Sequence, residues 1–189
     1  KENNFFYYED KYGGLKIPKP NLNGQFQIEN ASTAIATLRI LEDIKIQDQH
    51  IINGIQKANN IARLEEIKSG KLKDLVKNTK LILDSSHNPG GAKVLNDYLQ
   101  TLECNKHIII GMMANKDHEK YISYFKDISS LTTIDIPNQP NAISGKDLKD
   151  KFKIIPNVQY KDNIEQAIKS ISLKENDLII ITGSLYLLS

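Results

Sequence analysis

The sequence has 189 residues with 25 basic and 23 acidic side chains, so its formal net charge is +2. Its 40% hydrophobic and 25% charged residues are typical of a globular protein and exclude a disordered tail. The basic residues are scattered along the chain, which disfavours nucleic acid or an acidic membrane as the main partner.

Three features of the sequence predict a cytoplasmic protein. Its longest apolar runs, residues 108–113 and 178–189, are shorter than the ~20 residues that a membrane-spanning helix needs. Its single cysteine, Cys104, has no partner for an internal disulfide, and no signal-peptide pattern opens the chain. Because the chain starts with Lys-Glu-Asn-Asn and a turn-rich segment, we expect it to be a piece of a longer protein.

The first twenty residues predict a strand and a turn. The aromatic run of residues 5–8 favours the strand, Gly13 and Gly14 favour the turn, and Pro18 and Pro20 favour an extended connector.

Two helices are expected next. Apolar residues at three- and four-residue steps predict a helix over residues 27–42. Its apolar face consists of Ile28, Ala31, Ile35, Leu38 and Leu41. Ile51, Ile52 and Ile55 mark a second, short helix that frays over residues 56–60. Neither helix closes a domain by itself.

Beyond residue 61 the pattern changes to short apolar runs that alternate with helical periodicity. The apolar runs are residues 81–83, 108–110, 134–136 and 178–181. The helical repeats between them are Ala92/Leu95/Leu99/Leu102, Tyr121/Phe125/Ile128 and Ile164/Ile168/Ile171. We also expect a strand over residues 63–69 and short helices over residues 72–77 and 145–153. This alternation predicts an α/β fold, a Rossmann-like and mostly parallel sheet covered by helices.

Ligands of such sheets bind at the carboxyl ends of the strands, which selects the loops 84–91, 112–118 and 182–185. The first loop opens a helix, so its backbone N–H groups and the helix dipole favour an anion. Asp84 could accept from ribose hydroxyls, and His87 could donate to a phosphate or an oxyanion. The alternative is that Asp84 and Asn88 are turn and cap residues and His87 is a surface histidine.

Five segments, in order, resemble the folylpolyglutamate and dihydrofolate synthases, which are relatives of the Mur ligases. Residues 81–92, LILDSSHNPGGA, are similar to that family's Asp-Gly-Ala-His-Asn-Pro loop. Residues 22–31 are similar to its Leu-x-Gly-x-x-Gln-x-x-Asn-Ala pattern, and residues 62–65 to its Gly-Arg-x-Glu turn. Residues 111–117 resemble Gly-Met-x-x-x-Lys-Asp, and residues 182–186, TGSLY, resemble the terminal motif.

The sequence departs from the family pattern at several positions. Ser85 and Ser86 stand in place of Gly-Ala, Ala62 in place of the glycine before Arg63, and Asn115 where an acidic residue is frequent. The first two departures remove backbone freedom but no functional group. The chain also lacks a Gly-x-x-x-x-Gly-Lys-[Ser/Thr] phosphate loop.

The resemblance implies two domains: residues 1–61 as the end of a central ATP-binding domain, and residues 62–189 as a Mur ligase C-terminal glutamate-ligase domain. It implies that Asn30, Arg63 and Asp84 contact ATP. Asn30 lies about 140° round the helix from Ile35, off the apolar face. The alternatives are a helix-start residue at Asn30 and a surface charge at Arg63.

Two further site residues are implied by the resemblance. His87 would lie near the γ-phosphate or the acyl phosphate as a catalytic residue, and Ser184 would help to place the amino-acid substrate. Lys116 and Asp117 could be a loop charge and a helix N-cap. Of the four histidines, His50, His107 and His118 receive no role.

The activity implied is ATP-dependent amide ligation, in which L-glutamate is added to folate or dihydropteroate through an acyl phosphate. The cofactors expected are ATP and Mg²⁺, with the magnesium ligands N-terminal to this segment. We expect a monomer, inactive alone, with small-molecule substrates and neither nucleic acid nor membrane as partners. The alternatives are a Mur-type ligase of cell-wall precursors or a non-catalytic nucleotide- or partner-binding domain. A NAD-binding domain is disfavoured because no Gly-x-Gly-x-x-Gly follows any expected strand.

Overall fold

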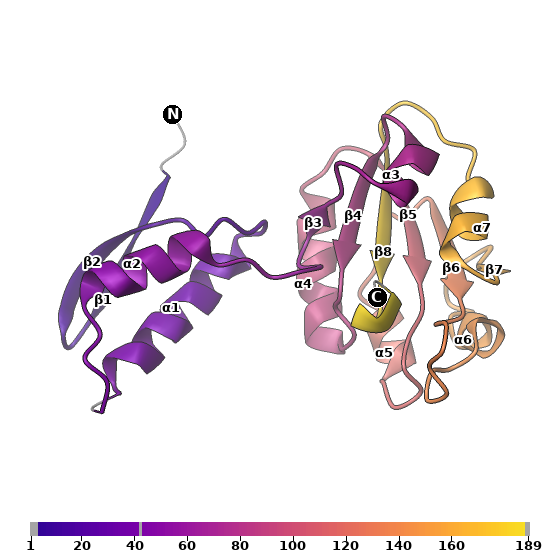
Figure 1. Cartoon of the computed structure of the whole chain (residues 1–189). Helices are drawn as coiled ribbons and strands as arrows, with labels where there is room; N and C mark the ends of the chain where they lie inside the picture. The colour runs from indigo at the N-terminus through magenta and orange to yellow at the C-terminus, as the bar shows by residue number, and fades with distance from the viewer. Residues whose placement is uncertain (1–3, 42, 188–189) are drawn as a thin grey trace. The chain divides into compact units, whose positions relative to one another are not determined.

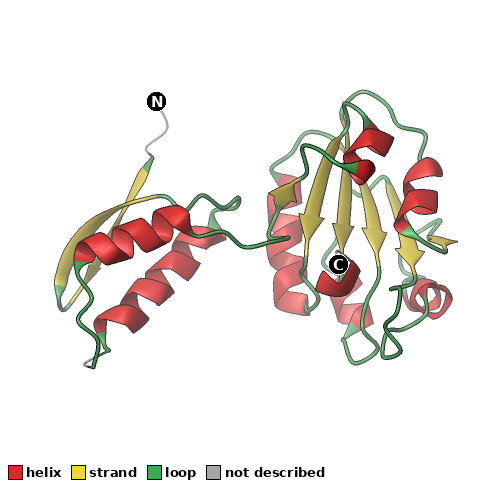
Figure 2. Ribbon diagram, in the orientation of Figure 1, coloured by secondary structure: helices red, strands yellow, loops and turns green. Residues whose placement is uncertain are grey.

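The structure is a computed structural model that describes residues 4–41 and 43–187. The chain divides into two compact units, Lys1–Ile61 and Ala62–Ser189. Each unit has its own layers of helix and strand (Figures 1 and 2). None of the described helices is long and apolar enough to cross a membrane.

The first unit packs two helices against a two-stranded antiparallel hairpin (Figure 1). Its elements are β1 (Phe5–Asp10), β2 (Gly13–Pro18), α1 (Phe26–Arg39) and α2 (Asp48–Lys57). Side chains alternate across a strand, so one face of the hairpin is buried against the helices. The core of this unit consists of Phe6, Leu15, Ile17, Ala31, Ile35 and Ile51.

Two sequence predictions in this unit were wrong. Gly13 and Gly14 do not form the turn; they begin β2, and the turn lies at Lys11 and Tyr12. The first helix ends at Arg39, so Leu41 is outside it and 44% exposed, while residue 42 lies outside the described residues. The helical spacing continued by chance beyond the true end of the helix.

Arg39, one of the two arginines, ties this unit together. Its guanidinium donates to Asp10 Oδ1 and to the Gly13 carbonyl oxygen, both at 2.8 Å, and to Asp48 Oδ1 at 3.3 Å. It also lies 5.5 Å from the centre of the Tyr8 ring. These contacts join the hairpin to both helices, and they need the planar, many-donor group of an arginine.

The second unit is a six-stranded sheet with the order β3-β4-β8-β5-β6-β7 (Figure 1). Its strands are β3 (Glu65–Glu66), β4 (Lys80–Asp84), β5 (Asn105–Ile110), β6 (Ser130–Ile134), β7 (Gln159–Lys161) and β8 (Asp177–Thr182). Its helices are α3 (Lys71–Val76), α4 (Pro89–Gln100), α5 (His118–Ile122), α6 (Gly145–Lys151), α7 (Ile164–Lys169) and the 3₁₀ turn η1 (Leu185–Leu187). Only β3 is antiparallel to its neighbour, so the predicted α/β fold with a mostly parallel sheet is confirmed.

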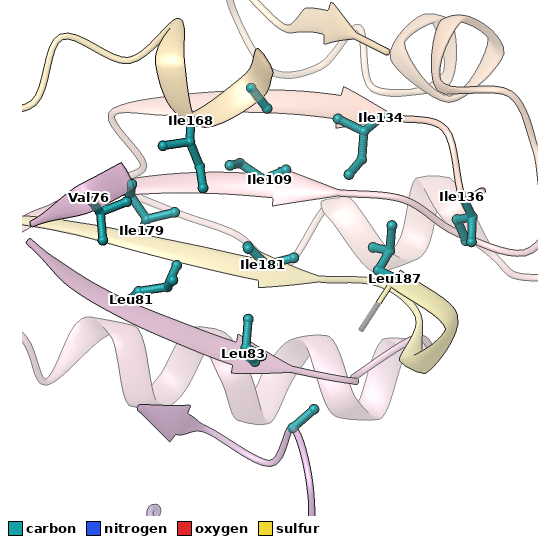
Figure 3. Close-up of a cluster of buried hydrophobic side chains, with 12 residues drawn as sticks. Val76, Leu81, Leu83, Ile109, Ile134, Ile136, Ile168, Ile179, Ile181 and Leu187 are labelled. Carbon is teal, nitrogen blue, oxygen red and sulfur yellow. The ribbon is translucent and has the colours of Figure 1, made fainter. Parts of the chain in front are cut away.

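Helices cover both faces of this sheet, which explains why its central strands read as unbroken apolar runs. On one face, Val76 of α3 and Ile168 of α7 pack on Leu81, Ile109 and alternating residues of the central strands (Figure 3). The alternate residues between them point to the opposite face and are also buried: Ile82, Ile108, Ile110 and Ile180.

The sequence missed some boundaries of the second unit. The strand expected over residues 63–69 is only Glu65–Glu66, and the strand expected over residues 134–136 is Ser130–Ile134. The strand β7 was not expected at all, because Gln159–Lys161 is a short edge strand without an apolar run.

Candidate functional site

The three loops selected from the sequence leave the sheet at the same edge. In the parallel pairing, Thr182 at the end of β8 lies opposite both Asp84 at the end of β4 and Ile110 at the end of β5. Because β8 lies between the other two strands, the loops that follow these three residues are neighbours, as expected.

Glycine lets the backbones of these loops touch. Gly183 has a φ of +102°, and a Cβ at this position would lie 2.5 Å from the carbonyl oxygen of Gly111. The Gly183 N–H donates to the carbonyl oxygen of Ser86 at 3.1 Å, and the Gly111 N–H donates to that of Thr182 at 3.4 Å. A side chain at residue 183 would therefore meet both an unfavourable backbone conformation and a clash between β8 and β5.

Three hydroxyl groups form a buried cluster beneath the loops. The phenol oxygen of Tyr121 on α5 lies 3.1 Å from Ser86 Oγ and 3.0 Å from Thr182 Oγ1, and the two aliphatic hydroxyls are 3.2 Å apart. All three residues are buried, and Tyr121 is fully so. Burial raises the pKa of the Tyr121 phenol, so it stays protonated and available as a donor.

The carboxylate of Asp84 organises the first loop. Its Oδ2 accepts from the Leu64 N–H at 3.0 Å and its Oδ1 accepts from the Ser86 N–H at 2.9 Å, and only 4% of the residue is exposed. The turn role left open for this residue is confirmed, while its contact with ATP stays a prediction. Since Arg63 precedes Leu64 and His87 follows Ser86, one carboxylate fixes the backbone beside two predicted site residues.

The segment before β3 has two buried residues with positive φ, Ala62 at +54° and Leu64 at +50°. The Ala62 N–H donates to Glu65 Oε2 at 2.8 Å, and its carbonyl oxygen accepts from the Ser85 N–H at 2.7 Å. Each L-residue in this region costs about 1 kcal/mol. The departure from glycine at residue 62 therefore falls where glycine would be least strained.

His87 is half-buried at the start of the loop, and one of its ring nitrogens forms a hydrogen bond with the backbone. Its Nδ1 lies 2.9 Å from the Ser85 carbonyl oxygen, which can only accept, so Nδ1 carries a proton. The Nε2 atom is then the ring nitrogen left for a ligand. The next residue, Asn88, caps α4 by accepting from the Gly91 N–H at 2.8 Å, so the cap interpretation of Asn88 is confirmed.

The other predicted site residues are in different surroundings. Arg63 is half-buried and makes no ion pair within residues 4–41 and 43–187. Ser184 is buried, and its Oγ accepts from the Tyr186 N–H at 3.2 Å. Asn30 is exposed on α1, off the buried face as expected, and donates to Gln27 Oε1 at 3.0 Å. Asn30 belongs to the first unit, whereas the three loops belong to the second.

Tyr121 was expected only as a core residue, because its helical spacing marks an apolar face and says nothing about its hydroxyl group. The sequence signal that could have found it is the pair of hydroxyl residues, Ser86 and Thr182, placed where two neighbouring strands end. Asp117 accepts from the Lys120 N–H at 3.1 Å, which confirms it as the N-cap of α5. Nowhere in the described residues do three or more His, Cys, Asp or Glu side chains gather to hold a metal ion.

The second unit matches a known family. The sequence pattern of the Mur ligase, glutamate ligase domain, matches residues 62–185. This match covers the second unit almost completely and more than half of the chain. The chain therefore belongs to the Mur ligase family, and the resemblance derived from its motifs is confirmed.

Several solved structures match this chain, whereas a search of curated proteins gave no match. The folylpolyglutamate synthase of Thermotoga maritima is 26% identical, with a TM-score of 0.67 over 92% of this chain and 39% of that chain. The bifunctional folylpolyglutamate synthase/dihydrofolate synthase of Yersinia pestis is 22% identical, with a TM-score of 0.76 over 99% of this chain and 43% of that one.

The Mycobacterium tuberculosis folylpolyglutamate synthase, complexed with ADP and AMPPCP, is 17% identical, with a TM-score of 0.75 over 98% of this chain and 46% of that one. At these identities the Yersinia and Mycobacterium structures show the shared fold. The chain spans less than half the length of each of the three relatives.

Proposed function

We propose that this chain is the C-terminal part of an ATP-dependent ligase that joins the amino group of L-glutamate to a carboxylate of folate or dihydropteroate. The observation that carries the proposal is the meeting of the loops 84–91, 112–118 and 182–185 at one edge of a Mur ligase domain. The likeness to folylpolyglutamate synthases along 92–99% of the chain supports folate over a cell-wall precursor.

We assign the first unit to the end of an ATP-binding domain. Its support is that the matched structures cover both units, although the family pattern matches the second unit alone. Asn30, exposed on α1, is its proposed contact with ATP.

In the proposed reaction, ATP supplies the phosphoryl group that activates the substrate carboxylate. The carboxylate oxygen attacks the γ-phosphorus and ADP leaves. The glutamate nitrogen then attacks the acyl carbon, an amide bond forms, and inorganic phosphate and a proton are released. The loops exclude water, which would otherwise hydrolyse the activated acyl group.

Three residues of this chain have separate proposed roles in this reaction. The Arg63 guanidinium, which no carboxylate neutralises within the described residues, suits a phosphate oxygen. The Nε2 atom of His87 is left for the reacting groups by the bond at Nδ1. Ser184 helps to place glutamate through the backbone turn that its hydroxyl group holds.

Asp84 acts on ATP chiefly through the backbone beside Arg63 and His87. As the resemblance implies, we assign the Mg²⁺ ligands to residues N-terminal to this segment, and no step here uses the ion. Several relatives carry a nucleotide, and one of Yersinia pestis carries AMPPNP and a Mn ion, which supports a nucleotide and a divalent ion as cofactors.

The test is phosphate release from ATP by the longest natural protein that carries this sequence. We expect release that requires glutamate together with dihydropteroate or a folate, and none from the 189-residue chain alone. Asp84→Ala should mainly raise the KM for ATP, because it frees the backbone of the Arg63 segment, whereas His87 keeps its own hydrogen bond to the Ser85 carbonyl oxygen. Absence of substrate-dependent release from the longer protein would favour a non-catalytic binding domain.

A further inference from the structure

The hydroxyl cluster of Ser86, Tyr121 and Thr182 joins three segments that are far apart in the sequence. Ser86 lies in the loop after β4, Thr182 ends β8, and Tyr121 lies on α5, which follows the loop after β5. Their exposed fractions are 3%, 1% and 0%, so their hydrogen bonds do not compete with water. In such surroundings a hydrogen bond is strong and an unpaired hydroxyl group is costly.

Every proton in the cluster has an acceptor. The Tyr121 hydroxyl group donates to the Ser86 carbonyl oxygen at 3.1 Å, and the Gly183 N–H donates to the same oxygen at 3.1 Å. Thr182 Oγ1 also donates to this oxygen, at a longer 3.4 Å, and the two shorter bonds fill its two lone pairs. The hydroxyl groups of Ser86 and Thr182 can then donate to the phenol oxygen or to each other, at 3.0 to 3.2 Å.

We propose that Tyr121 and Ser86 are positioning residues for the amide-forming step. The phenol fixes the backbone immediately before His87 and, through Thr182 and Gly183, the backbone immediately before Ser184. The cluster thus sets the distance between the loop that contains His87 and the segment that contains Ser184, the residue proposed to help place glutamate. This inference rests on the proposed function, but the hydrogen-bond arrangement that it uses can be tested without activity.

Tyr121→Phe isolates the hydroxyl group, because the ring keeps its packing against Phe125, 5.4 Å away between ring centres. Tyr160→Phe is the matched control. It also removes one phenol hydrogen bond, from Tyr160 to Asp135 Oδ2 at 2.6 Å, but at β7 and away from the cluster. Ser86→Ala is a second variant with a smaller change, which keeps the test open if Tyr121→Phe does not fold.

The first readout is amide hydrogen exchange on the 189-residue chain. In Tyr121→Phe, exchange of the Gly183 N–H should become about tenfold faster relative to that of Ile180 in the middle of β8, because a buried hydrogen-bond network has lost its centre. In Tyr160→Phe the two amides should change together. Unchanged relative exchange at Gly183 in both Tyr121→Phe and Ser86→Ala would overturn the proposal.

The second readout is activity of the longer enzyme at a temperature at which each variant is fully folded. Tyr121→Phe should lower kcat for glutamate-dependent phosphate release by about tenfold, Ser86→Ala by less, and Tyr160→Phe not at all. A wild-type kcat in Tyr121→Phe would overturn the positioning role. If the wild type itself shows no glutamate-dependent release, the proposed function fails, while the exchange measurement still decides whether the cluster holds the loops.

Discussion

The two edges of the sheet in the second unit bury polar groups of different kinds. At the carboxyl edge, the end of the sheet where the parallel strands finish, three neutral hydroxyl groups centred on Tyr121 lie beside the buried Asp84 carboxylate, which accepts from two backbone N–H groups. At the amino edge, the end of the sheet where the parallel strands begin, the buried groups are an acid and a base. His107 Nε2 lies 3.4 Å from Asp177 Oδ2, and His107 Nδ1 lies 2.8 Å from Ser130 Oγ.

The Tyr121 cluster and the Asp177 pair therefore differ in how their stability depends on pH. Burial alone would raise the pKa of Asp177, but hydrogen bonds from the Lys174 N–H and from Asn105, together with His107, lower it below its ordinary value. The raised pKa of Tyr121 keeps its hydroxyl group neutral. We therefore expect the hydroxyl cluster at the carboxyl edge to keep its hydrogen bonds across neutral pH, and acid to weaken the Asp177 contacts at the amino edge.

The largest effect should come from filling the contact between the loops at the carboxyl edge. Gly183→Ala should lower the free energy of unfolding by about 2 to 5 kcal/mol, because it combines a positive φ with a Cβ 2.5 Å from the Gly111 carbonyl oxygen. Gly70→Ala is the matched control, since Gly70 has a φ of +95° with nothing within 4 Å of a Cβ. If urea unfolding showed equal decreases in the free energy of unfolding for both variants, the close contact of the added Cβ would contribute nothing.

The amino edge should show a smaller, pH-dependent effect. Asp177→Asn should lower the free energy of unfolding by about 1 to 3 kcal/mol at pH 7, because it weakens a buried, hydrogen-bonded carboxylate. The folded pKa of Asp177 is lowered, so its stabilisation is complete above the unfolded pKa of about 3.9 and is lost as pH falls through the folded pKa. The difference between wild type and variant should thus shrink in acid below pH ~4.

The control for this prediction is Asp97→Asn, which removes an exposed pair with Lys93 and should cost less than about 0.5 kcal/mol. A wild-type–Asp177→Asn difference that stays constant down to pH ~2 would contradict the account of the amino edge.

The smallest effect is expected at the strained segment beside the carboxyl edge. Ala62→Gly relieves a φ of +54°, worth about 1 kcal/mol, but removes a buried methyl group, worth about 0.8 kcal/mol. The free energy of unfolding should change by less than about 0.5 kcal/mol. A larger loss would mean that the methyl group packs more tightly than its burial suggests, and a larger gain that the strain dominates.

The sequence was informative wherever burial was two-sided. The central strands are unbroken apolar runs because helices cover both of their faces, so their positions and the three loops at their ends could be predicted. It was uninformative where few side chains are buried, as in β7 (Gln159–Lys161), and in the hairpin, where Gly13 and Gly14 have turn chemistry but lie in a strand.

The functional site could be predicted only in part from the sequence, for a related reason. Asp84, His87 and Arg63 stand out by residue type, whereas the hydroxyl group of Tyr121 acts through partners 35 and 61 residues away. Hydrogen bonds over such separations leave no periodic trace in the sequence, and helical spacing gave Tyr121 the same appearance as any core aromatic residue. The structure supplies those partners.

The central claim is that the carboxyl edge carries the reaction and the amino edge carries stability alone. The most direct test compares the kcat of glutamate-dependent phosphate release for two histidine variants of the longer enzyme, one at each edge. We predict that His87→Ala lowers kcat by about 10²-fold, as expected for a group that assists the reacting atoms, while His107→Gln lowers stability and leaves kcat unchanged. An unchanged kcat in His87→Ala, or an equal loss in both folded variants, would contradict the claim.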